Sequence, residues 1–506
     1  MTQVRRCVPL PCSKTQAENE MNMKLNYKRT ILVGFAFFLI SAFWQAYDAI
    51  VPLTLTNHFG LPQSISGVVM SIDNILAVFM LPIFGALSDK VITKFGRRTP
   101  FIVAGTVASV ISFILLTVVN GIQLNALVNS GIVDKYNTAL DAYNATKGVD
   151  PAGAEAVFDA VKEALKEEAL GLTLSNIWPL VGFIGVLLVV LIAMATFRSP
   201  AVALMPDVTI KPLRSKANAI INLMGTAGGI IVLLFSSIFK ITSNPYMSFT
   251  AYVIATCIVM IVGLVIFIAT VKERKWSDEM ESESERLGLN DEKTNDNSGN
   301  RSLDKAELKS LFLILASVAL WYIGYNSITS KYSVYSTNVL GVNYGLTLIV
   351  AQAAAIVSYI PVGIVASKFG RRKTILAGVA ILASAFFIGN FINPGASPLV
   401  MYPIFALAGI GWATINVNSF PMVVELAKGG EVGKYTGYYY TASMAAQIVA
   451  PILSGFLYDL FGMRAMFFSF GTVFVVLSFV TMFFVKHGDS KAEKQGALES
   501  LGGADD

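Results

Sequence analysis

Long runs of hydrophobic residues, each about the length of a membrane-crossing helix, recur along the whole chain. A helix needs roughly 20 apolar residues to cross about 30 Å of hydrocarbon. The first run, from Ile31 to Leu55, exceeds that length and is too long for a cleaved signal peptide. The pattern predicts twelve transmembrane helices, over residues 30–53, 63–87, 100–120, 176–205, 216–240, 248–271, 308–330, 345–366, 374–392, 399–424, 436–459 and 464–486.

A polar segment divides these helices into two groups of six. Residues 272–307 are rich in Glu, Ser, Asn, Asp and Lys and poor in aromatic residues, so they cannot bury enough surface to fold alone and we expect a disordered linker. The predicted organisation is an N-terminal tail over 1–29, a first half over 30–271, the linker, a second half over 308–486 and a C-terminal tail over 487–506.

One connection in the first half is unusually long. Residues 121–175 carry more acidic than basic side chains, and 154–169 have helical spacing. Basic loops stay in the cytoplasm, whereas an acidic loop is tolerated outside. We expect this insertion to form a small extracellular cap or a poorly ordered loop in preference to a binding element.

Charge is sparse and concentrated beside the predicted helices. The chain is 54% hydrophobic and 14% charged, with a net charge of +5, whereas soluble domains are about 25% charged. Lys and Arg cluster before the first helix, between the second and third, and between the eighth and ninth. The positive-inside rule then places both termini in the cytoplasm of a cell-membrane protein. The bilayer accounts for the basic residues, so we expect no nucleic-acid partner.

The sequence lacks the residue patterns that several classes of function require. The chain has 3 cysteines and 2 histidines in no metal-binding spacing, and no Gly-x-x-x-x-Gly-Lys-Ser/Thr phosphate loop. We therefore expect no metal, no cofactor, no enzymatic activity and no ATP-driven pumping. Transport of a small molecule must then draw on an ion gradient.

The two halves share a cytoplasmic loop motif. A Gly-x-x-x-Asp or Gly-x-x-x-Ser segment ending one helix is followed by Phe-Gly-Arg-Arg before the next. Acids after helices 4 and 10 are candidate partners for these arginines, and such pairs latch a loop against helix ends in one access state. The predicted cytoplasmic gate is Gly85, Asp89, Gly96, Arg97, Arg98 and Asp207 in the first half, with Gly370, Arg371, Arg372 and Glu425 in the second.

Three charged residues fall inside predicted helices: Asp48, Asp73 and Arg198. A charge at the middle of a membrane helix costs at least about 2.5–3.5 kcal/mol, so it usually faces a partner or a water-filled path. Either carboxylate is a candidate for binding the coupling proton, with Arg198 as the modulating cation. The alternative is a fixed salt bridge that only holds helices together.

Aromatic and amide side chains also recur inside the helices. Sugars bind to this mixture, because aromatic rings cover the flat apolar faces of a sugar and amides bond its hydroxyl groups. Aromatic stripes also serve helix packing, which is the alternative for each residue alone. The predicted substrate-binding residues are Trp44, Gln45, Asn74, Trp321, Tyr322, Tyr325, Asn326, Trp412, Asn416, Tyr439 and Gln447.

Segments 81–90 (Leu-Pro-Ile-Phe-Gly-Ala-Leu-Ser-Asp-Lys) and 94–102 (Lys-Phe-Gly-Arg-Arg-Thr-Pro-Phe-Ile) closely resemble the helix 2–3 signature of sucrose-carrier-like major facilitators. Segments 198–207 and 320–326 resemble helices 4 and 7 of the same branch. The resemblance implies the major facilitator fold, with two pseudo-symmetric halves around a central site. It also implies proton-coupled symport of a glycoside such as sucrose or maltose.

Two positions depart from the related patterns. Plant sucrose carriers place an arginine after the proline of helix 4, whereas Arg198 precedes Pro200 here. The related glycoside-pentoside-hexuronide carriers place two carboxylates ahead of the helix 2 proline, where this chain has Ala77 and Leu81. The second departure argues against sodium coupling of that kind.

The sequence therefore predicts a monomeric proton-coupled sugar symporter. Two alternatives stay open: an exporter of an amphipathic solute or drug, and a membrane sensor that keeps the fold without transporting. A sensor has no need for the repeated gate motifs, and an exporter would favour a more apolar cavity.

Overall fold

The computed structural model describes residues 25–287, 304–394, 397–426 and 432–487. Within these ranges twelve helices are long and apolar enough to cross a bilayer, which confirms the predicted all-α membrane fold. The spanning helices are α2 (Tyr27–Leu53), α3 (Gln63–Lys90), α4 (Thr99–Asn129), α7 (Trp178–Asp207), α8 (Arg214–Ile238), α9 (Thr250–Thr270), α11 (Lys305–Thr329), α13 (Tyr344–Phe369), α14 (Arg371–Gly389), α15 (Pro398–Val424), α16 (Val432–Phe461) and α17 (Met463–Phe483).

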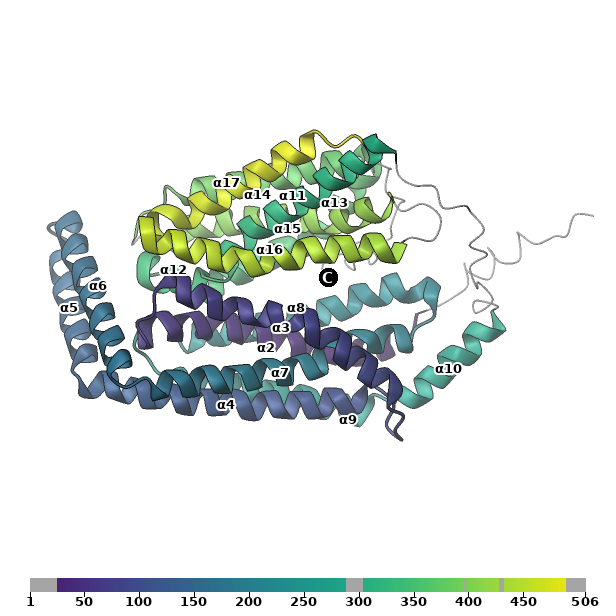
Figure 1. Cartoon of the computed structure of the whole chain (residues 1–506), viewed down its shortest axis with the longest axis horizontal. Helices are drawn as coiled ribbons and strands as arrows, with labels where there is room; N and C mark the ends of the chain where they lie inside the picture. The colour runs from purple at the N-terminus through teal and green to yellow at the C-terminus, as the bar shows by residue number, and fades with distance from the viewer. Residues whose placement is uncertain (1–24, 288–303, 395–396, 427–431, 488–506) are drawn as a thin grey trace, which may run out of the picture.

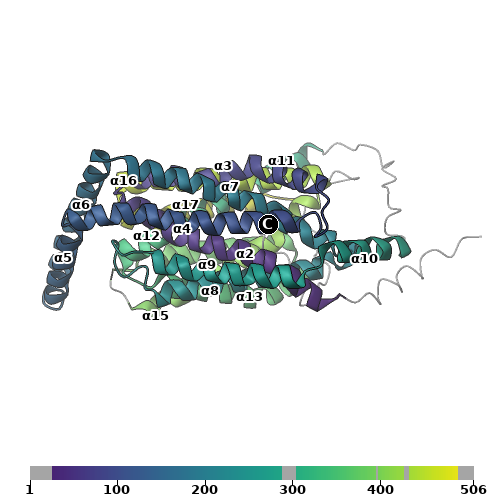
Figure 2. The same cartoon turned by 90° about the horizontal axis from the view of Figure 1, so that it is seen from below.

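The two halves pack in the same pattern. In the first half α2 lies against α8 and α9, and α4 lies against α7; in the second, α11 lies against α16 and α17, and α14 against α15. The halves meet through two equivalent pairs, α3 with α16 and α13 with α8 (Figures 1 and 2). A site between the halves is therefore bounded by helices that belong to both repeats.

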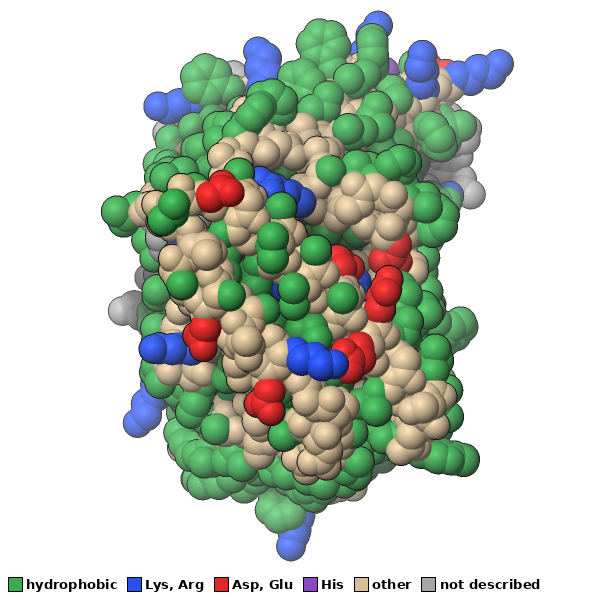
Figure 3. All heavy atoms as spheres, turned by 90° about the vertical axis from the view of Figure 1, so that its left-hand side faces the viewer, with side chains coloured by type: hydrophobic (Ala, Val, Ile, Leu, Met, Phe, Trp, Pro, Cys, Tyr) green, Lys and Arg blue, Asp and Glu red, His purple; other side chains and the backbone are tan. Residues whose placement is uncertain are grey.

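The two ends of the bundle differ, and we name them by what they carry. At the hairpin end, α5 (Ile132–Thr146) and α6 (Pro151–Ser175) project beyond the spanning helices (Figure 1). At the opposite linker end lies α10 (Glu273–Arg286), which follows the last helix of the first half. Figure 3 views the hairpin end and shows acidic and basic side chains interspersed over it, with hydrophobic side chains around the rim.

The insertion between α4 and α7 is a helical hairpin; the spacing over 154–169 predicts its second helix, α6, but not the first, α5. The side chain of Asp150 caps α6 by accepting a hydrogen bond from the Gly153 amide, and Pro151 occupies the first helical position. A small hydrophobic core that includes Leu127, Tyr136 and Leu165 holds the hairpin on α4. Because these side chains need a surface to pack on, α4 continues past the predicted end at 120 to Asn129.

The disorder predicted for 272–307 is wrong for residues 273–286, which form α10. The helix docks on the first half through two side chains, Glu273 and Trp276, that are 3% and 7% exposed. The Arg29 guanidinium lies 5.3 Å from the Trp276 ring centroid and pairs with Glu279 at 2.5 Å. Composition missed this helix because a few anchoring contacts suffice when a folded surface is already present. Residues 288–303 lie outside the described residues.

Candidate functional site

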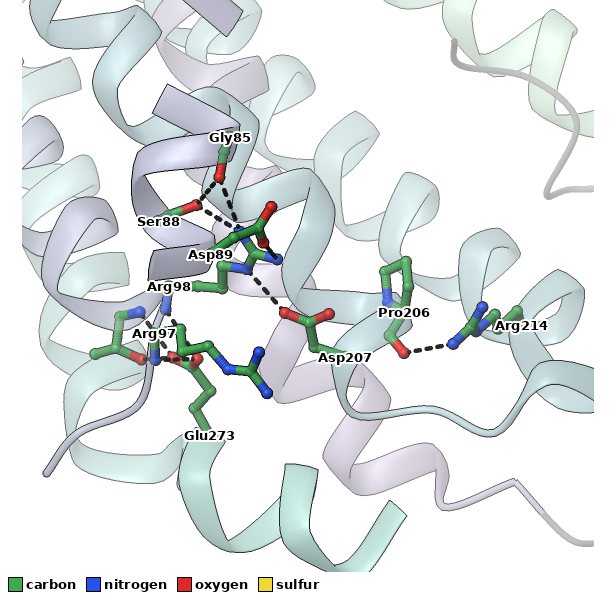
Figure 4. Close-up of polar contacts among 10 residues, drawn as sticks. Gly85, Ser88, Asp89, Arg97, Arg98, Pro206, Asp207, Arg214 and Glu273 are labelled. Atoms are coloured by element: carbon green, nitrogen blue, oxygen red, sulfur yellow. Dashed lines mark hydrogen bonds and ion pairs between the residues drawn. The ribbon is translucent and has the colours of Figure 1, made fainter. Parts of the chain in front are cut away.

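At the linker end, Arg98 is the centre of a buried polar cluster (Figure 4). Its guanidinium Nη2 lies 2.5 Å from Asp89 Oδ1 on α3, and its Nε lies 2.8 Å from Asp207 Oδ2 on α7. Its Nη1 donates to Ser88 Oγ at 2.5 Å. The helix approach is close here, since a Cβ at Gly85 would meet Ser199 Oγ at 2.9 Å. Arg98 therefore ties the ends of three helices together.

The loop before α4 is held by a carboxylate from α10. Glu273 accepts hydrogen bonds from the amides of Arg97, Arg98 and Thr99 at 2.6, 2.8 and 2.7 Å (Figure 4). A carboxylate at this position satisfies amides that a helix start leaves unpaired and complements the helix dipole. Gly96 permits the approach: its φ is +116°, and a Cβ there would lie 2.2 Å from the Glu273 carboxyl carbon. Sequence spacing gave no sign of this cap.

The second half repeats the cluster with fewer members. Arg371 Nε lies 2.5 Å from Glu425 Oε1, so the acid expected from the sequence is the one in contact. Arg372 donates instead to the Phe483 carbonyl at the end of α17. Ser367, which stands where the first half has Asp89, bonds its own helix at the Ile364 carbonyl. In the first half, Asp207 pairs with Arg98, and the described residues give the Arg97 side chain no ion pair.

At the hairpin end, two charged residues of the second half hold the start of α3. Asp459 accepts from the Gln63 and Ser64 amides at 2.7 Å each, so it caps a helix that has no cap of its own. Lys331 is fully buried and donates to the Gln63 carbonyl at 3.2 Å and Ser66 Oγ at 2.6 Å. These contacts join the two halves at this end.

Glycines let α3 and α16 cross closely beneath that contact. A Cβ at Gly67 would lie 2.0 Å from the Pro451 carbonyl oxygen, and one at Gly455 would lie 2.3 Å from the Gln63 carbonyl oxygen. Ser71 Oγ adds a hydrogen bond to the Ile448 carbonyl at 2.9 Å. The hairpin end is therefore closed by backbone contact as well as by charge. Figure 1 shows α3 and α16 separating from this crossing toward the linker end.

A cavity of about 410 Å³ lies between the halves at mid-depth. Cavities of roughly 300–1,000 Å³ hold small-molecule ligands. Both halves supply its wall, chiefly α2 and α8 from the first and α11, α13 and α15 from the second. Four of the predicted substrate-binding residues line it: Trp44, Gln45, Tyr325 and Trp412.

One wall of the cavity is an aromatic stack. The Tyr325 and Trp412 rings are parallel within 8°, with centroids 3.7 Å apart, and Tyr322 packs edge-on against Trp412 at 5.3 Å. The opposite repeat supplies Trp44, over which Arg198 lies at 5.6 Å. The stack presents a flat apolar surface of the kind that covers the face of a ring-shaped ligand.

The cavity also contains a chain of polar groups that crosses between the halves. Gln45 Nε2 donates to the Tyr344 hydroxyl at 3.1 Å, and Gln352 Nε2 donates to Gln45 Oε1 at 3.2 Å. Asn222 lines the same cavity, and among the described residues neither polar atom of its side chain has a partner. An unpaired buried amide is costly, so Asn222 is suited to bonding a ligand.

Tyr344, Gln352 and Asn222 are site residues that the substrate prediction missed. Gln352 is a lone amide in an otherwise apolar run, and this signal alone could have singled it out. Asn222 lies on α8 one turn before Gly225 and two turns before Gly229. Both glycines line the cavity, and Gly225 also packs closely against α2, where a Cβ would meet Ser41 Oγ at 2.9 Å.

The three intramembrane charges gather on one side of this cavity. Asp48 lines it, and Asp73 lies within electrostatic range of both Asp48 and Arg198. Asn74 Nδ2 donates to Asp73 Oδ1 at 2.9 Å. Among the described side chains no ion pair within 4 Å joins Arg198 to either carboxylate. The cluster is therefore a set of adjacent charges in this state and not a direct salt bridge.

The remaining predicted substrate residues do not line the cavity. Trp321 is fully buried in the hydrophobic core and does not reach the cavity. Asn326 bonds the Tyr322 carbonyl of its own helix at 2.9 Å, and the Tyr439 hydroxyl lies 2.9 Å from Ser419 Oγ. The other predicted residues outside the cavity lining are Asn74, Tyr322, Asn416 and Gln447.

Comparison with known proteins agrees with this architecture. The family model described as "Major Facilitator Superfamily" matches residues 169–358 and 343–502, and that described as "MFS/sugar transport protein" matches residues 32–128. An uncharacterized MFS-type transporter of Schizosaccharomyces pombe is 29% identical over 26% of this chain and 28% of its own length. The MFS-type transporter ppzB of Metarhizium rileyi is 28% identical over 25% of this chain and 26% of its own. The chain thus matches about a quarter of the length of these relatives.

Solved structures share the fold over nearly the whole chain. A bacterial homologue of the iron transporter ferroportin, in an inward-facing state, has a TM-score of 0.59 at 14% identity, covering 91% of this chain and 99% of the other. A D-xylose-proton symporter has a TM-score of 0.56 at 14% identity, covering 92% and 99%. Together with a family model that spans more than half of the sequence, these findings show that the chain belongs to the major facilitator superfamily, whose members are membrane transporters and not enzymes.

Proposed function

We propose that this protein is a proton-coupled symporter of a neutral glycoside of the sucrose or maltose type. The observation that carries the proposal is the central cavity, in which the Tyr325–Trp412 stack faces the Gln45–Gln352 amide chain. A sugar needs both surfaces, since its ring faces are apolar and its edge is covered with hydroxyl groups. The match of residues 32–128 to a sugar-transport model and the sucrose-carrier-like loop motifs support the same class.

Coupling is proposed to run through the charges beside that cavity. Asp73 takes up the proton, Asp48 contacts the solute, and Arg198 stabilises the deprotonated carboxylate when the helices rearrange. A proton on Asp73 removes one of two neighbouring negative charges, and this change favours a different packing of α2, α3 and α7. Binding of solute and proton then favours the same rearrangement, which is the requirement for symport.

The linker end is proposed to face the cytoplasm, with both termini on that side of a cell membrane. Arg98 lies there beside Glu273 of α10, and the start of α14 carries the equivalent basic cluster with Arg371, as the positive-inside rule requires. With this orientation, the end that α3 and α16 close faces the outside, and we infer that the described conformation is inward-facing. The Arg98 and Arg371 clusters then form the cytoplasmic gate, and one chain contains both closures, so we propose that a monomer transports.

Uptake in proteoliposomes tests the assignment. Purified protein under an inward proton gradient should accumulate labelled sucrose or maltose, and a protonophore should abolish the accumulation. Efflux of an amphipathic dye in exchange for protons, without glycoside uptake, would support the exporter alternative. A folded, inserted protein that moves neither class of solute would support the sensor alternative.

We predict that Trp412→Ala weakens glycoside binding by about tenfold, because it removes one face of the aromatic stack, worth about 1.4 kcal/mol. Binding is measured by isothermal titration calorimetry in detergent. Trp178→Ala is the matched control: this tryptophan is 76% exposed at the start of α7, away from the cavity, and its loss should leave Kd unchanged. Equal effects of the two substitutions would argue against a ligand on the stack.

Lys331 predicts a pH dependence of the closure at the hairpin end. Burial lowers the pKa of Lys331 from its ordinary value of 10.5 to about 7; Asp459 opposes this shift and Lys166 adds to it. When the halves separate there, the ammonium regains water and its ordinary pKa. At any pH between these two pKa values, opening is therefore accompanied by the uptake of a proton. Within this pH range, each unit by which the pH falls favours opening by up to about tenfold. Below pH 7 the ammonium is charged in both states and the effect ends.

The distance between spin labels on cysteines at Ser130 and Leu399 reports this opening, since both residues are exposed at the hairpin end of their halves. Double electron–electron resonance between pH 7 and 10 should show the separated population rising as pH falls. Lys331→Met removes the titrating group and should flatten the dependence. An unchanged slope in that variant would rule out Lys331 as its source.

A further inference from the structure

The α5–α6 hairpin belongs to the first half by sequence, yet it makes polar contacts to the second half. Glu155 Oε1, near the start of α6, lies 2.7 Å from Arg464 Nη1 at the start of α17. Two helical turns further along α6, Lys162 Nζ donates to the Asn338 carbonyl at 2.9 Å. Asp159 holds the same ammonium at 2.6 Å. Two residues of α6 thus reach across the boundary between the halves.

The hairpin is rigidly attached to the first half. The Tyr143 and Phe158 rings stack at 5.0 Å inside it, and Tyr136 packs edge-on against Tyr246 in the α8–α9 connection at 5.5 Å. Gln123 Nε2 on α4 donates to Thr173 Oγ1 on α6 at 2.9 Å. The hairpin must therefore move with the first half whenever the two halves rotate apart.

On the side that faces the second half, by contrast, a cavity separates the hairpin from its neighbours. A cavity of about 450 Å³ lies between α6 and the second half, lined by Lys162 and Lys166 on one side and Tyr458, Asp459 and Arg464 on the other. The buried core of the hairpin consists of first-half residues. Its attachment to the second half is thus polar and partly hydrated, with Arg464 and Glu155 side chains 51% and 28% exposed. Exposed polar contacts of this kind cost little free energy to break, whereas separating buried apolar surfaces costs more.

We propose that the α5–α6 hairpin is a strap that holds the hairpin end closed, through Glu155 on Arg464 and Lys162 on Asn338. The strap is carried by the first half and must release both contacts before that end can open. It adds to the α3–α16 closure and biases the protein toward the state open at the linker end. The proposal concerns the balance between two conformations, so it stands whether the transported solute is a sugar or another molecule.

The test compares two double variants of the full chain without any solute. Glu155→Gln with Lys162→Met removes both strap contacts. Lys135→Met with Glu168→Gln is the matched control, because this pair, at 2.7 Å, lies within the hairpin and does not reach the second half. Spin labels at Ser130 and Leu399 measure the population in which the hairpin end is open.

Loss of the strap should raise the ratio of open to closed protein by about tenfold, the combined effect of one exposed ion pair and one charge-assisted hydrogen bond. The control variant should match the wild type. An unchanged ratio in the strap variant, or an equal rise in the control, would overturn the proposal.

Salt provides a second measurement that needs no substitution in the strap. Exposed ion pairs are screened as the Debye length falls from about 10 Å at 0.1 M to about 3 Å at 1 M. The open population of the labelled wild-type protein should therefore rise over this range. A salt-independent population would overturn the proposal even if the strap variant did not fold. Failure of glycoside uptake would leave both measurements unaffected, so the two proposals fail separately.

Discussion

Asp73→Asn is expected to abolish proton-driven accumulation of the solute and to leave exchange at equal pH intact. One proton per solute under a gradient of one pH unit supplies about 1.4 kcal/mol, which sustains about tenfold accumulation. An amide of the same shape keeps the hydrogen-bonding geometry next to Asn74 but cannot take up a proton. The variant should therefore equilibrate solute to a ratio near one. Uptake into proteoliposomes with and without a gradient measures both properties.

Asp141→Asn is the control, because Asp141 is exposed on the hairpin and far from the central cavity in sequence and fold. It should accumulate solute like the wild type. Persistent accumulation in Asp73→Asn would exclude this residue as the coupling site and leave Asp48, the carboxylate that lines the cavity, as the next to test. Loss of exchange together with accumulation would indicate a structural role for Asp73.

Arg98→Ala is expected to destabilise the linker end and slow transport by at least about tenfold. The guanidinium side chain is 7% exposed and bonds Asp89, Asp207 and Ser88. Removing it leaves two carboxylates close together with no cation between them. Breaking a buried pair costs about 3–5 kcal/mol, and we expect about 2 kcal/mol here because Asp89 and Asp207 are 59% and 29% exposed. Thermal unfolding in detergent and initial uptake rates measure the two effects.

The neighbouring arginine is the matched control for that substitution. Arg97 contributes its backbone amide to Glu273, and its side chain is exposed, so Arg97→Ala should change stability by less than about 0.5 kcal/mol. Arg371→Ala should reproduce the Arg98 effect in the second half, since Arg371 pairs with Glu425 at 2.5 Å. Equal losses from Arg97→Ala and Arg98→Ala would show that loop charge, and not the specific pair, matters.

The loop motifs at the linker end show how much of the structure motif spacing alone can predict. The repeat of Gly-Arg-Arg after helices 2 and 8 was enough to anticipate that Asp207 and Glu425 meet arginines, because both partners lie at the ends of neighbouring helices. Which arginine each acid meets depends on the exact turn of the loop. Arg98 points inward and Arg97 outward because Gly96, at φ +116°, and the Glu273 cap orient the start of α4.

The predicted substrate-binding residues show what the sequence could not decide. Tyr325 and Trp412 were recognisable as candidates, but so was Trp321, which is buried in the core. The sequence identifies an aromatic residue in a membrane helix, but it does not show whether that residue faces the cavity, a neighbouring helix or the lipid. Only the packing of α11 against α16 and α17 decides which face meets the cavity.

What the sequence by itself determined is the set of spanning helices, their division into two repeats and the loop motifs. Helices form locally in lipid because every backbone amide must be bonded within its own segment, so hydropathy suffices to find them. The tertiary structure alone decided the rest: the docking of α10, the caps that Glu273 and Asp459 place on distant helices, and the bridge from α6 to the second half. Each of these joins residues more than 170 positions apart, and no local pattern encodes such a contact.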